Sequence, residues 1–177
     1  TNIERKKFTE ELDRNYRLIH RVDESSDTTH GMVWLKTMIH AVAARDGCAV
    51  VLIDPWNELE HLPEPVESLP NYTNFALMRL RHWATKSHLH ICVIAHPRKM
   101  EEGKRPLGYS ISDSAAWANK PDMGWTVHQE PADEDGRQLV SLTTWKVRSR
   151  QSTGCRPRMI KLEFDESAMV YRAPLRS

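Results

Sequence analysis

The stretch from Cys48 to Asp54 constrains the fold more than any other part of the sequence. It is a run of apolar or small residues that does not alternate with polar ones, and it ends in a carboxylate followed by Pro55. Such a run is typical of a strand buried on both faces, as in a parallel sheet covered by helices. Pro55 lacks a backbone N–H, so the strand is expected to stop there. Asp54 is then expected at the carboxyl edge of a sheet, where open α/β folds bind ligands.

A second apolar run repeats this arrangement. Leu89–Ala95 is predicted to be another buried strand, and it ends at His96, which is again followed by a proline. Between the two runs, residues 72–86 carry apolar side chains at helical spacing and are predicted to form an amphipathic helix. A strand, a helix and a strand in this order predict a right-handed parallel crossover. Asp54 and His96 are therefore expected at the same edge of one sheet.

The chain before Cys48 is predicted to hold two helices and a short strand. Residues 3–14 are charged, with two apolar residues spaced for one helical face, and are predicted to form a surface helix. Residues 16–20 alternate weakly and are read as a strand. Apolar residues recur at helical spacing from Met32 to Val42, and Gly47 is well placed as the C-terminal stop of that helix.

The chain after residue 110 changes character. Residues 111–119 are predicted to form a short helix, and residues 124–129, 139–147 and 159–164 are predicted to form strands. Asp135-Gly136 is a hairpin turn signal between the first two of these strands. The predicted fold class is therefore α/β, with parallel core strands flanked by helices and C-terminal antiparallel strands in one mixed sheet. At 177 residues, the chain is expected to form a single domain.

Composition narrows the choice of partners. The chain has 25 Lys and Arg residues against 24 Asp and Glu residues, so any nucleic-acid site must be a local patch. Its three scattered cysteines argue against a disulfide framework or a zinc knuckle, and favour a reducing compartment. No apolar run approaches about 18 residues, so no membrane span is predicted.

Two local basic groups are candidates for phosphate contact. The loop after His96 carries four cations, which are Arg98, Lys99, Lys104 and Arg105. Loops of this kind bind phosphate backbones. Lys146 and Arg148 alternate at the end of a predicted strand, so they share one face. An arginine at a strand end can complete a phosphate site on a neighbouring subunit.

One absence bears on nucleotide binding. The pattern G-x-x-x-x-G-K-[ST], which cradles the β- and γ-phosphates, does not occur in the sequence. This chain alone is therefore expected to bind ATP poorly and to be inactive. Because it also lacks an initiator Met, it is expected to be a fragment or a trimmed chain.

Four blocks, in order, resemble the C-terminal half of the RecA-like motor domain of hexameric replicative helicases, the DnaB, phage primase–helicase and Twinkle group. Residues 50–58 resemble their Walker B segment, and residues 93–100 their sensor strand with the DNA-binding loop behind it. Residues 114–122 resemble a block that carries a further DNA-facing loop. Residues 146–150, running on to Gly154, are similar to their K-x-R arginine-finger segment. The resemblance covers the chain from about residue 28, which makes 1–177 a single partial domain from Walker B onward.

The resemblance implies a role for each matching position. Asp54 would organise Mg²⁺ at the nucleotide, and His96 would sense the γ-phosphate. Arg148 would act as a finger on the ATP of the adjacent subunit, with Lys146 assisting. Cations of the basic loop would hold single-stranded DNA, and Ser114 belongs to the second DNA-facing block. The implied partners are ATP, Mg²⁺, single-stranded DNA and identical subunits in a ring, expected to be a hexamer. The implied setting is the replication fork in the cytoplasm of a bacterium or phage-infected host.

The sequence departs from that family at three points. The phosphate loop and the water-activating glutamate are missing, and both would lie upstream of Thr1. Asp113 stands where the family usually has glycine, and an acid would weaken phosphate contact there.

Two alternatives stay open. One is a RecA-like module that binds subunits or DNA without hydrolysis. The other is a metal-dependent hydrolase that uses Asp54, Glu58, Glu60 and His61, since such an acidic group could hold a hard cation.

Overall fold

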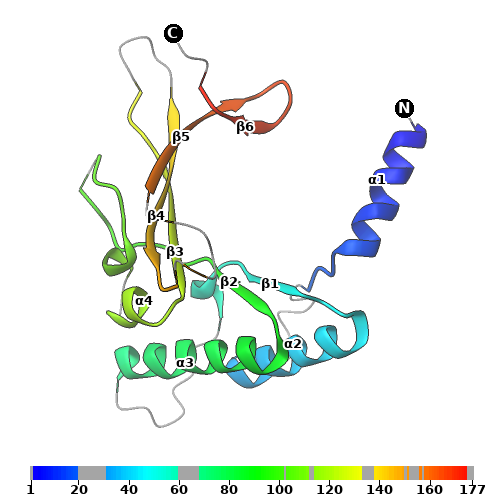
Figure 1. Ribbon diagram of the computed structural model, residues 1–177, viewed down its shortest axis with the longest axis vertical. Helices are drawn as coiled ribbons and strands as arrows, with labels where there is room; N and C mark the ends of the chain where they lie inside the picture. The colour runs from blue at the N-terminus through cyan, green and yellow to red at the C-terminus, as the bar shows by residue number, and fades with distance from the viewer. Residues whose placement is uncertain are drawn as a thin grey trace.

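The computed structural model describes residues 2–19, 31–59, 68–101, 103–111, 114–132, 138–149, 151, 156 and 158–174. The elements, in chain order, are α1 (Asn2–Asn15), α2 (Met32–Asp46), β1 (Val50–Ile53), the 3-10 helix η1 (Trp56–Glu58), α3 (Leu69–Ser87), β2 (His90–Val93), the 3-10 helix η2 (Gly108–Ser110), α4 (Ala116–Asn119), β3 (Met123–Gln129), β4 (Leu139–Val147), β5 (Arg158–Asp165) and β6 (Val170–Arg172). Figure 1 shows α2 and α3 side by side beneath β1 and β2, while β3 to β5 rise as a separate ribbon.

The N-terminal helix α1 projects away from the rest of the fold (Figure 1). The predicted helix over residues 3–14 is confirmed, and its apolar side is open, with Phe8 63% exposed. The strand predicted next is wrong for residues 16–19, which form no strand, and His20 lies outside the described residues. The guanidinium of Arg17 donates to the carbonyl oxygens of Asp13 and Tyr16. These local bonds hold the segment against the helix end instead of a neighbouring strand.

The prediction of α2 is confirmed. Gly47 ends the helix in the left-handed conformation, with φ +63°, which glycine adopts without the steric cost of a Cβ atom. The four apolar residues that defined the helical spacing, Met32, Leu35, Ile39 and Val42, are all buried. The helix therefore delivers the chain into β1 with its apolar stripe facing the core.

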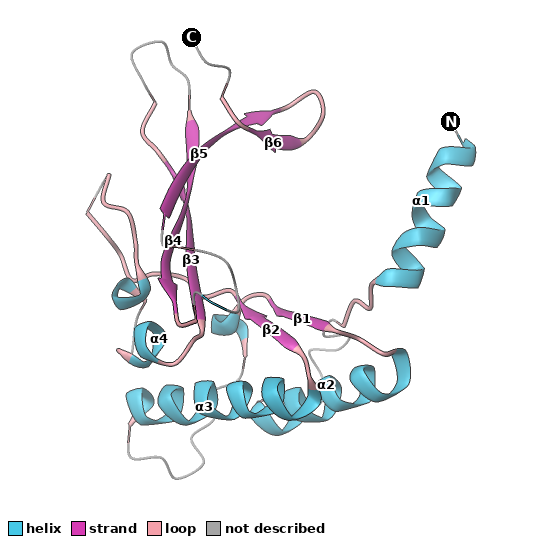
Figure 2. Ribbon diagram, viewed as in Figure 1, coloured by secondary structure: helices cyan, strands magenta, loops and turns pink. Residues whose placement is uncertain are grey.

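Strands β1 and β2 pair in parallel, as predicted, with the register running from Val50↔His90 to Ile53↔Val93. The prediction that the first strand is buried on both faces is wrong. Ile53 is 5% exposed, whereas Val50 and Leu52 are 58% and 59% exposed. The burial is one-sided because α2 and α3 lie on the same side of this pair of strands (Figure 2).

The C-terminal strands form an antiparallel sheet in the order β3-β4-β5-β6. The predicted turn at Asp135-Gly136 lies outside the described residues, but the two strands that flank it pair as expected. At Gly124, a β-bulge interrupts the register, and an added Cβ atom would sit 2.2 Å from the ring of Trp145. Glycine at this position therefore allows the indole of β4 to lie against β3.

The single mixed sheet predicted from the sequence is not what the described residues form. They form a two-stranded parallel sheet and a four-stranded antiparallel sheet. In the antiparallel sheet, each strand pairs with its neighbour in sequence, so its hydrogen bonds are satisfied locally. Joining the two sheets requires a non-local pairing that none of the described strands makes. The broader assignment to the α/β class is confirmed.

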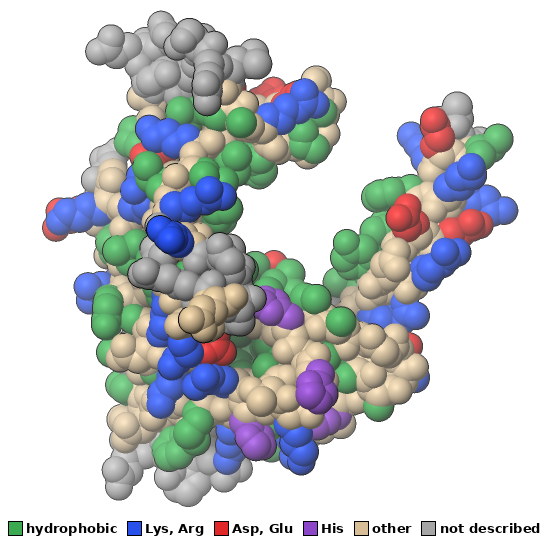
Figure 3. Space-filling model, viewed as in Figure 1, with side chains coloured by type: hydrophobic (Ala, Val, Ile, Leu, Met, Phe, Trp, Pro, Cys, Tyr) green, Lys and Arg blue, Asp and Glu red, His purple; other side chains and the backbone are tan. Residues whose placement is uncertain are grey.

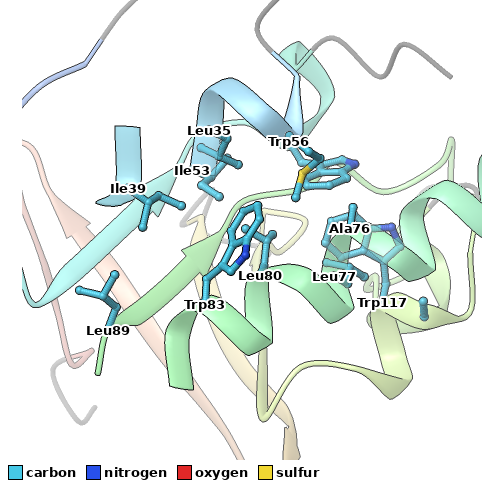
Figure 4. Close-up of a cluster of buried hydrophobic side chains, with 12 residues drawn as sticks. Leu35, Ile39, Ile53, Trp56, Ala76, Leu77, Leu80, Trp83, Leu89 and Trp117 are labelled. Atoms are coloured by element: carbon cyan, nitrogen blue, oxygen red, sulfur yellow. The ribbon is translucent and has the colours of Figure 1, made fainter. Parts of the chain in front are cut away.

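A cluster of buried tryptophan and aliphatic side chains packs α2, β1 and α3 against α4 (Figure 4). Trp56 of η1 and Trp117 of α4 meet edge to face, with ring centroids 5.4 Å apart and an interplanar angle of 86°. Leu77, Leu80 and Trp83 of α3 pack into the same cluster. Because Trp56 lies two residues after Asp54, this packing fixes the end of β1 against α4.

We expect Leu80→Ala to lower the free energy of unfolding by about 2 to 5 kcal/mol, because it opens a cavity in this cluster. Leu80 is 4% exposed. The matched control is Met78→Ala on the same helix, where the side chain is 45% exposed, and we expect a change within about 0.5 kcal/mol. Urea unfolding followed by circular dichroism measures both. Equal losses for the two variants would contradict the position of the core.

Candidate functional site

Asp54 and His96 lie at the same edge of the parallel pair, as the sequence predicted. The pairing continues past the strand ends, because the N–H of Ile94 donates to the carbonyl of Ile53 at 2.9 Å. The N–H of Trp56 then donates back to the carbonyl of Ile94 at 2.7 Å. Asp54 and His96 therefore leave a backbone-bonded rim, and both residues are exposed to solvent.

Asn57 is a residue of this rim whose part the sequence did not predict. Its side-chain oxygen accepts a hydrogen bond from the backbone N–H of His96 at 3.1 Å. This bond ties the segment after β2 to the segment after β1, 39 positions apart in the chain. No local pattern signals such a bond, because an exposed Asn after a strand is ordinarily a turn residue.

The rim can offer one carboxylate to a metal. Mg²⁺ usually keeps several waters and takes one or two carboxylates together with substrate phosphates. The exposed carboxylate of Asp54 fits that requirement. Among the described residues, no group of three or more His, Cys, Asp and Glu side chains could hold a metal ion by itself. Glu60 and His61, two of the four ligands considered for a metal-dependent hydrolase, lie outside the described residues.

The basic loop after His96 divides into free and engaged cations. Arg98 and Lys99 are exposed, and the backbone N–H of Arg98 donates to the carbonyl of Ser110. The ammonium of Lys104 lies 2.6 Å from Glu101 in an ion pair whose two side chains are 61% and 77% exposed. Water screens such a pair strongly, so Lys104 stays available to other anions.

Arg105 is held inside a polar network. Its Nη2 atom is 2.5 Å from a carboxylate oxygen of Glu130, and its Nε donates to the Ser141 hydroxyl at 3.1 Å. Ser141 is fully buried. The hydroxyl of Ser141 and the guanidinium of Arg105 hold the pKa of the Glu130 carboxyl below its usual value. Through these contacts Arg105 links the basic loop to the antiparallel sheet.

Ser114 begins the turn that leads into α4. Its hydroxyl oxygen accepts a hydrogen bond from the N–H of Ala116 at 3.1 Å. Its carbonyl accepts a bond from the N–H of Trp117 at 3.4 Å. The residue thus shapes the start of α4, while Asp113 lies outside the described residues.

Lys146 and Arg148 both donate hydrogen bonds to carbonyls at the C-terminal end of α4. The ammonium of Lys146 donates to the carbonyls of Ala118 and Asn119 at 2.5 and 2.7 Å. Burial lowers the pKa of Lys146, and the nearby charge of Arg148 lowers it further. Cations at this end of a helix satisfy carbonyls that have no intrahelical partner.

The guanidinium of Arg148 reaches the same helix end. Its Nη2 atom lies within hydrogen-bonding distance of the carbonyls of Asn119, Lys120 and Pro121, at 2.9, 3.1 and 3.4 Å. Its Nε atom is 2.7 Å from the carboxylate of Asp122. Arg148 remains 41% exposed and lies at the surface. Arg150, from the same predicted segment, lies outside the described residues.

Asp122 also pairs with a second arginine that the sequence did not single out. The Nη2 atom of Arg81, on α3, is 3.2 Å from the carboxylate oxygen that Arg148 contacts. Arg81 and Arg148 thus share one carboxylate, and Lys146 lies close enough for its charge to interact with that of Asp122. Figure 3 shows Lys and Arg side chains clustered over α3 and α4 on this side of the molecule. Arg81 and Asp122 are 41 positions apart, so no sequence pattern predicts their contact.

No family model matches the chain. The chain is 30% identical over 127 residues to the Twinkle homolog protein, chloroplastic/mitochondrial, of Arabidopsis thaliana. The matched stretch makes up 70% of this chain and 18% of that protein, so the chain spans under a fifth of its relative. The resemblance to the Twinkle group is confirmed to this extent. Among the described residues, every helix is too short or too polar to cross a bilayer.

The network of Arg105, Glu130 and Ser141 generates a pH prediction. The pKa of Glu130 is lower in the folded chain than its usual value of 4.5. The ionised Glu130 carboxylate therefore contributes its full stabilisation above pH 4.5. This stabilisation is lost as the pH falls through the folded-state pKa. We expect Glu130→Gln to cost about 1 to 3 kcal/mol at pH 7, and the difference from wild type to vanish in acid. Urea unfolding across the pH range measures it.

The control for this experiment is Glu101→Gln, which removes the exposed ion pair with Lys104 in the same loop. We expect its cost to stay within about 1 kcal/mol at every pH. A loss for Glu130→Gln that persisted unchanged below pH 3 would contradict a charged tie to Arg105.

Proposed function

We propose that this chain is the C-terminal part of an ATP-dependent, ring-forming DNA helicase motor, a single partial RecA-like domain from Walker B onward. The observation that carries the proposal is the placement of Asp54 and His96 at one rim of adjacent parallel strands. Ligands bind at this edge of α/β sheets. The similarity to a Twinkle homolog supports the same reading.

In the proposed motor, each rim residue has one task. Asp54 supplies an oxygen ligand for Mg²⁺ at the nucleotide, and His96 donates or loses a hydrogen bond as the γ-phosphate is present or absent. The bond from the His96 N–H to Asn57 links the segments that follow the two strands. The basic loop follows His96 directly and is placed to respond.

Arg148 is proposed to act on a neighbouring subunit. It is exposed, and it leaves the end of β4, so its guanidinium can reach an anion outside its own chain. Developing charge on the transferred phosphoryl group is what such an arginine stabilises. Lys146 is proposed to assist by holding the end of α4, which positions the backbone from which Arg148 projects.

Single-stranded DNA is the proposed substrate of the loop. Arg98, Lys99 and Lys104 are exposed and are placed to bind backbone phosphates. Arg105 contributes by bracing the loop against Glu130, and Ser114 by shaping the second DNA-facing segment. The proposed setting is a hexameric ring at the replication fork, in the cytoplasm of a bacterium or phage-infected host.

A second candidate is a RecA-like module that binds DNA or subunits without hydrolysis. The missing G-x-x-x-x-G-K-[ST] pattern would favour it only if Thr1 were the natural start of the protein. ATP hydrolysis by the product of the complete reading frame distinguishes the two candidates.

We expect Arg148→Ala in the complete protein to lower DNA-stimulated ATP hydrolysis by about 10³-fold or more, because arginine fingers contribute that much. The control is Arg172→Ala, which removes an arginine of β6 that pairs with Asp165 of β5. This substitution should leave ATP turnover unchanged. Mixing Arg148→Ala with Asp54→Ala subunits should restore part of the activity if the finger acts between subunits. Wild-type turnover in Arg148→Ala rings would refute the role.

For DNA, we expect Lys99→Ala to weaken the binding of oligothymidylate and to reduce the slope of log affinity against log salt by about 0.7. Fluorescence anisotropy at several salt concentrations measures both quantities. Lys161→Ala removes an equal charge from an exposed position of β5 and serves as the control. If both substitutions lower the affinity and the slope equally, the loop is not the contact surface.

A further inference from the structure

The surface around Asp122 holds an arrangement that the proposed function does not explain. Arg148 and Arg81 both contact one carboxylate oxygen of Asp122, at 2.7 and 3.2 Å. The Nε atom of Arg81 also lies 3.4 Å from the other oxygen. We propose that Asp122 acts as a latch, because its carboxylate positions Arg148 and competes with the phosphate group that Arg148 binds, while Arg81 eases the release of Arg148 from Asp122.

A carboxylate and a phosphate use the same contacts on a guanidinium. A carboxylate is planar and a phosphate is tetrahedral, but both present anionic oxygens. The guanidinium of arginine binds both groups through parallel N–H donors. Asp122 therefore occupies the Nε donor of Arg148, which an incoming phosphate group needs. Pyrophosphate and the terminal phosphate of a nucleotide carry more than one negative charge, so they can displace the carboxylate. A DNA phosphodiester carries one charge, as the carboxylate does, and competes with it on equal terms.

The pair is weak enough to open. Arg148, Asp122 and Arg81 have side chains that are 41%, 56% and 49% exposed. Ion pairs at such positions contribute little net stability, because water screens both partners. The contact with Asp122 can therefore orient the Arg148 side chain and still break when another anion binds.

Arg81 makes the release of Arg148 less costly. When Arg148 turns to a phosphate, Asp122 keeps two contacts with Arg81 and is not left without a cation. Lys146 stays bound to the carbonyls of α4, which retain a donor after the guanidinium leaves. The opened state thus has partners for every group that Arg148 leaves apart from the carbonyls of Lys120 and Pro121, two half-buried residues.

The backbone of Arg148 stays fixed while its side chain moves. The N–H of Arg148 donates to the carbonyl of Asp122 at 2.8 Å, which anchors the end of β4 to the start of β3. The change therefore reduces to a rotation of one side chain between two anionic partners. This inference rests on the proposed role of Arg148, and it names the residues that control access to it.

The test uses the 177-residue chain and pyrophosphate as the probe, with NMR of the Arg148 Nε–Hε signal as the readout. Asp122→Asn should move this signal toward the position of a solvated arginine and raise pyrophosphate affinity roughly two- to five-fold, as expected for a surface pair. Asp165→Asn removes an equal charge from the pair with Arg172 and should change neither quantity. Equal effects of the two substitutions, or no pyrophosphate-dependent shift, would overturn the latch.

The part played by Arg81 has its own control on the same helix. Arg81→Gln should lower pyrophosphate affinity more than Arg79→Gln, because Asp122 then holds Arg148 alone. The difference in pyrophosphate affinity between Arg81→Gln and Arg79→Gln should disappear when each is combined with Asp122→Asn. A difference that persists in that background means that Arg81 contacts the anion directly, which overturns its role in the latch.

Two further ligands identify the source of the phosphate group. A shift of the Arg148 signal by ATP but not by oligothymidylate assigns the latch to a nucleotide, and the reverse assigns it to a DNA backbone. Each of these outcomes supports the latch. The latch fails on the NMR signal or on the pyrophosphate affinities, whereas the helicase proposal fails on ATP turnover, so the two results are separate.

Discussion

The parallel pairing of β1 with β2 is the constraint on which the rest of the structure depends. Its register is set by backbone hydrogen bonds that continue beyond both strands, from the N–H of Ile94 to the carbonyl of Ile53 and from the N–H of Trp56 to the carbonyl of Ile94. A slip of one residue would turn Ile53 away from the core and move His96 along the rim. The positions of Asp54 and His96 therefore follow from main-chain geometry and from the burial of one face.

The sequence predicted what is local in this fold. Apolar spacing and Gly47 defined α2, and two apolar runs ending in a polar residue and proline defined β1 and β2. It failed where distant partners decide. The strand predicted at residues 16–20 does not form over its described residues, 16–19. The run at Cys48–Ile53 indicated burial on two faces, although α2 and α3 cover one. A pattern in one segment carries no information about how many other segments are present to cover it.

The same limit applies to the candidate site. The shared rim of Asp54 and His96 could be predicted because parallel strands present their ends together. The partners of the arginines could not, since Glu130 lies 25 positions from Arg105 and Asp122 lies 41 positions from Arg81. Cations that look alike in the sequence therefore differ in the structure, because some are held in ion pairs within the chain and others are exposed to solvent. Arg105, beside a Glu130 side chain that is 18% exposed, braces the loop, whereas Lys99 is open to solvent.

Helix α4 lies between the two halves of the candidate site. Its Trp117 packs edge to face on Trp56, two residues beyond Asp54, and its C-terminal carbonyls receive Lys146 and Arg148. A continuous path of contacts thus runs from the rim of the parallel pair to the end of β4. Contact alone does not couple two positions, because coupling requires an element with two arrangements that both positions bias. Packed indoles have one arrangement, since a close-packed core does not deform continuously. The exposed Arg148 side chain has two anionic partners available, so it is the element in this path that can change state.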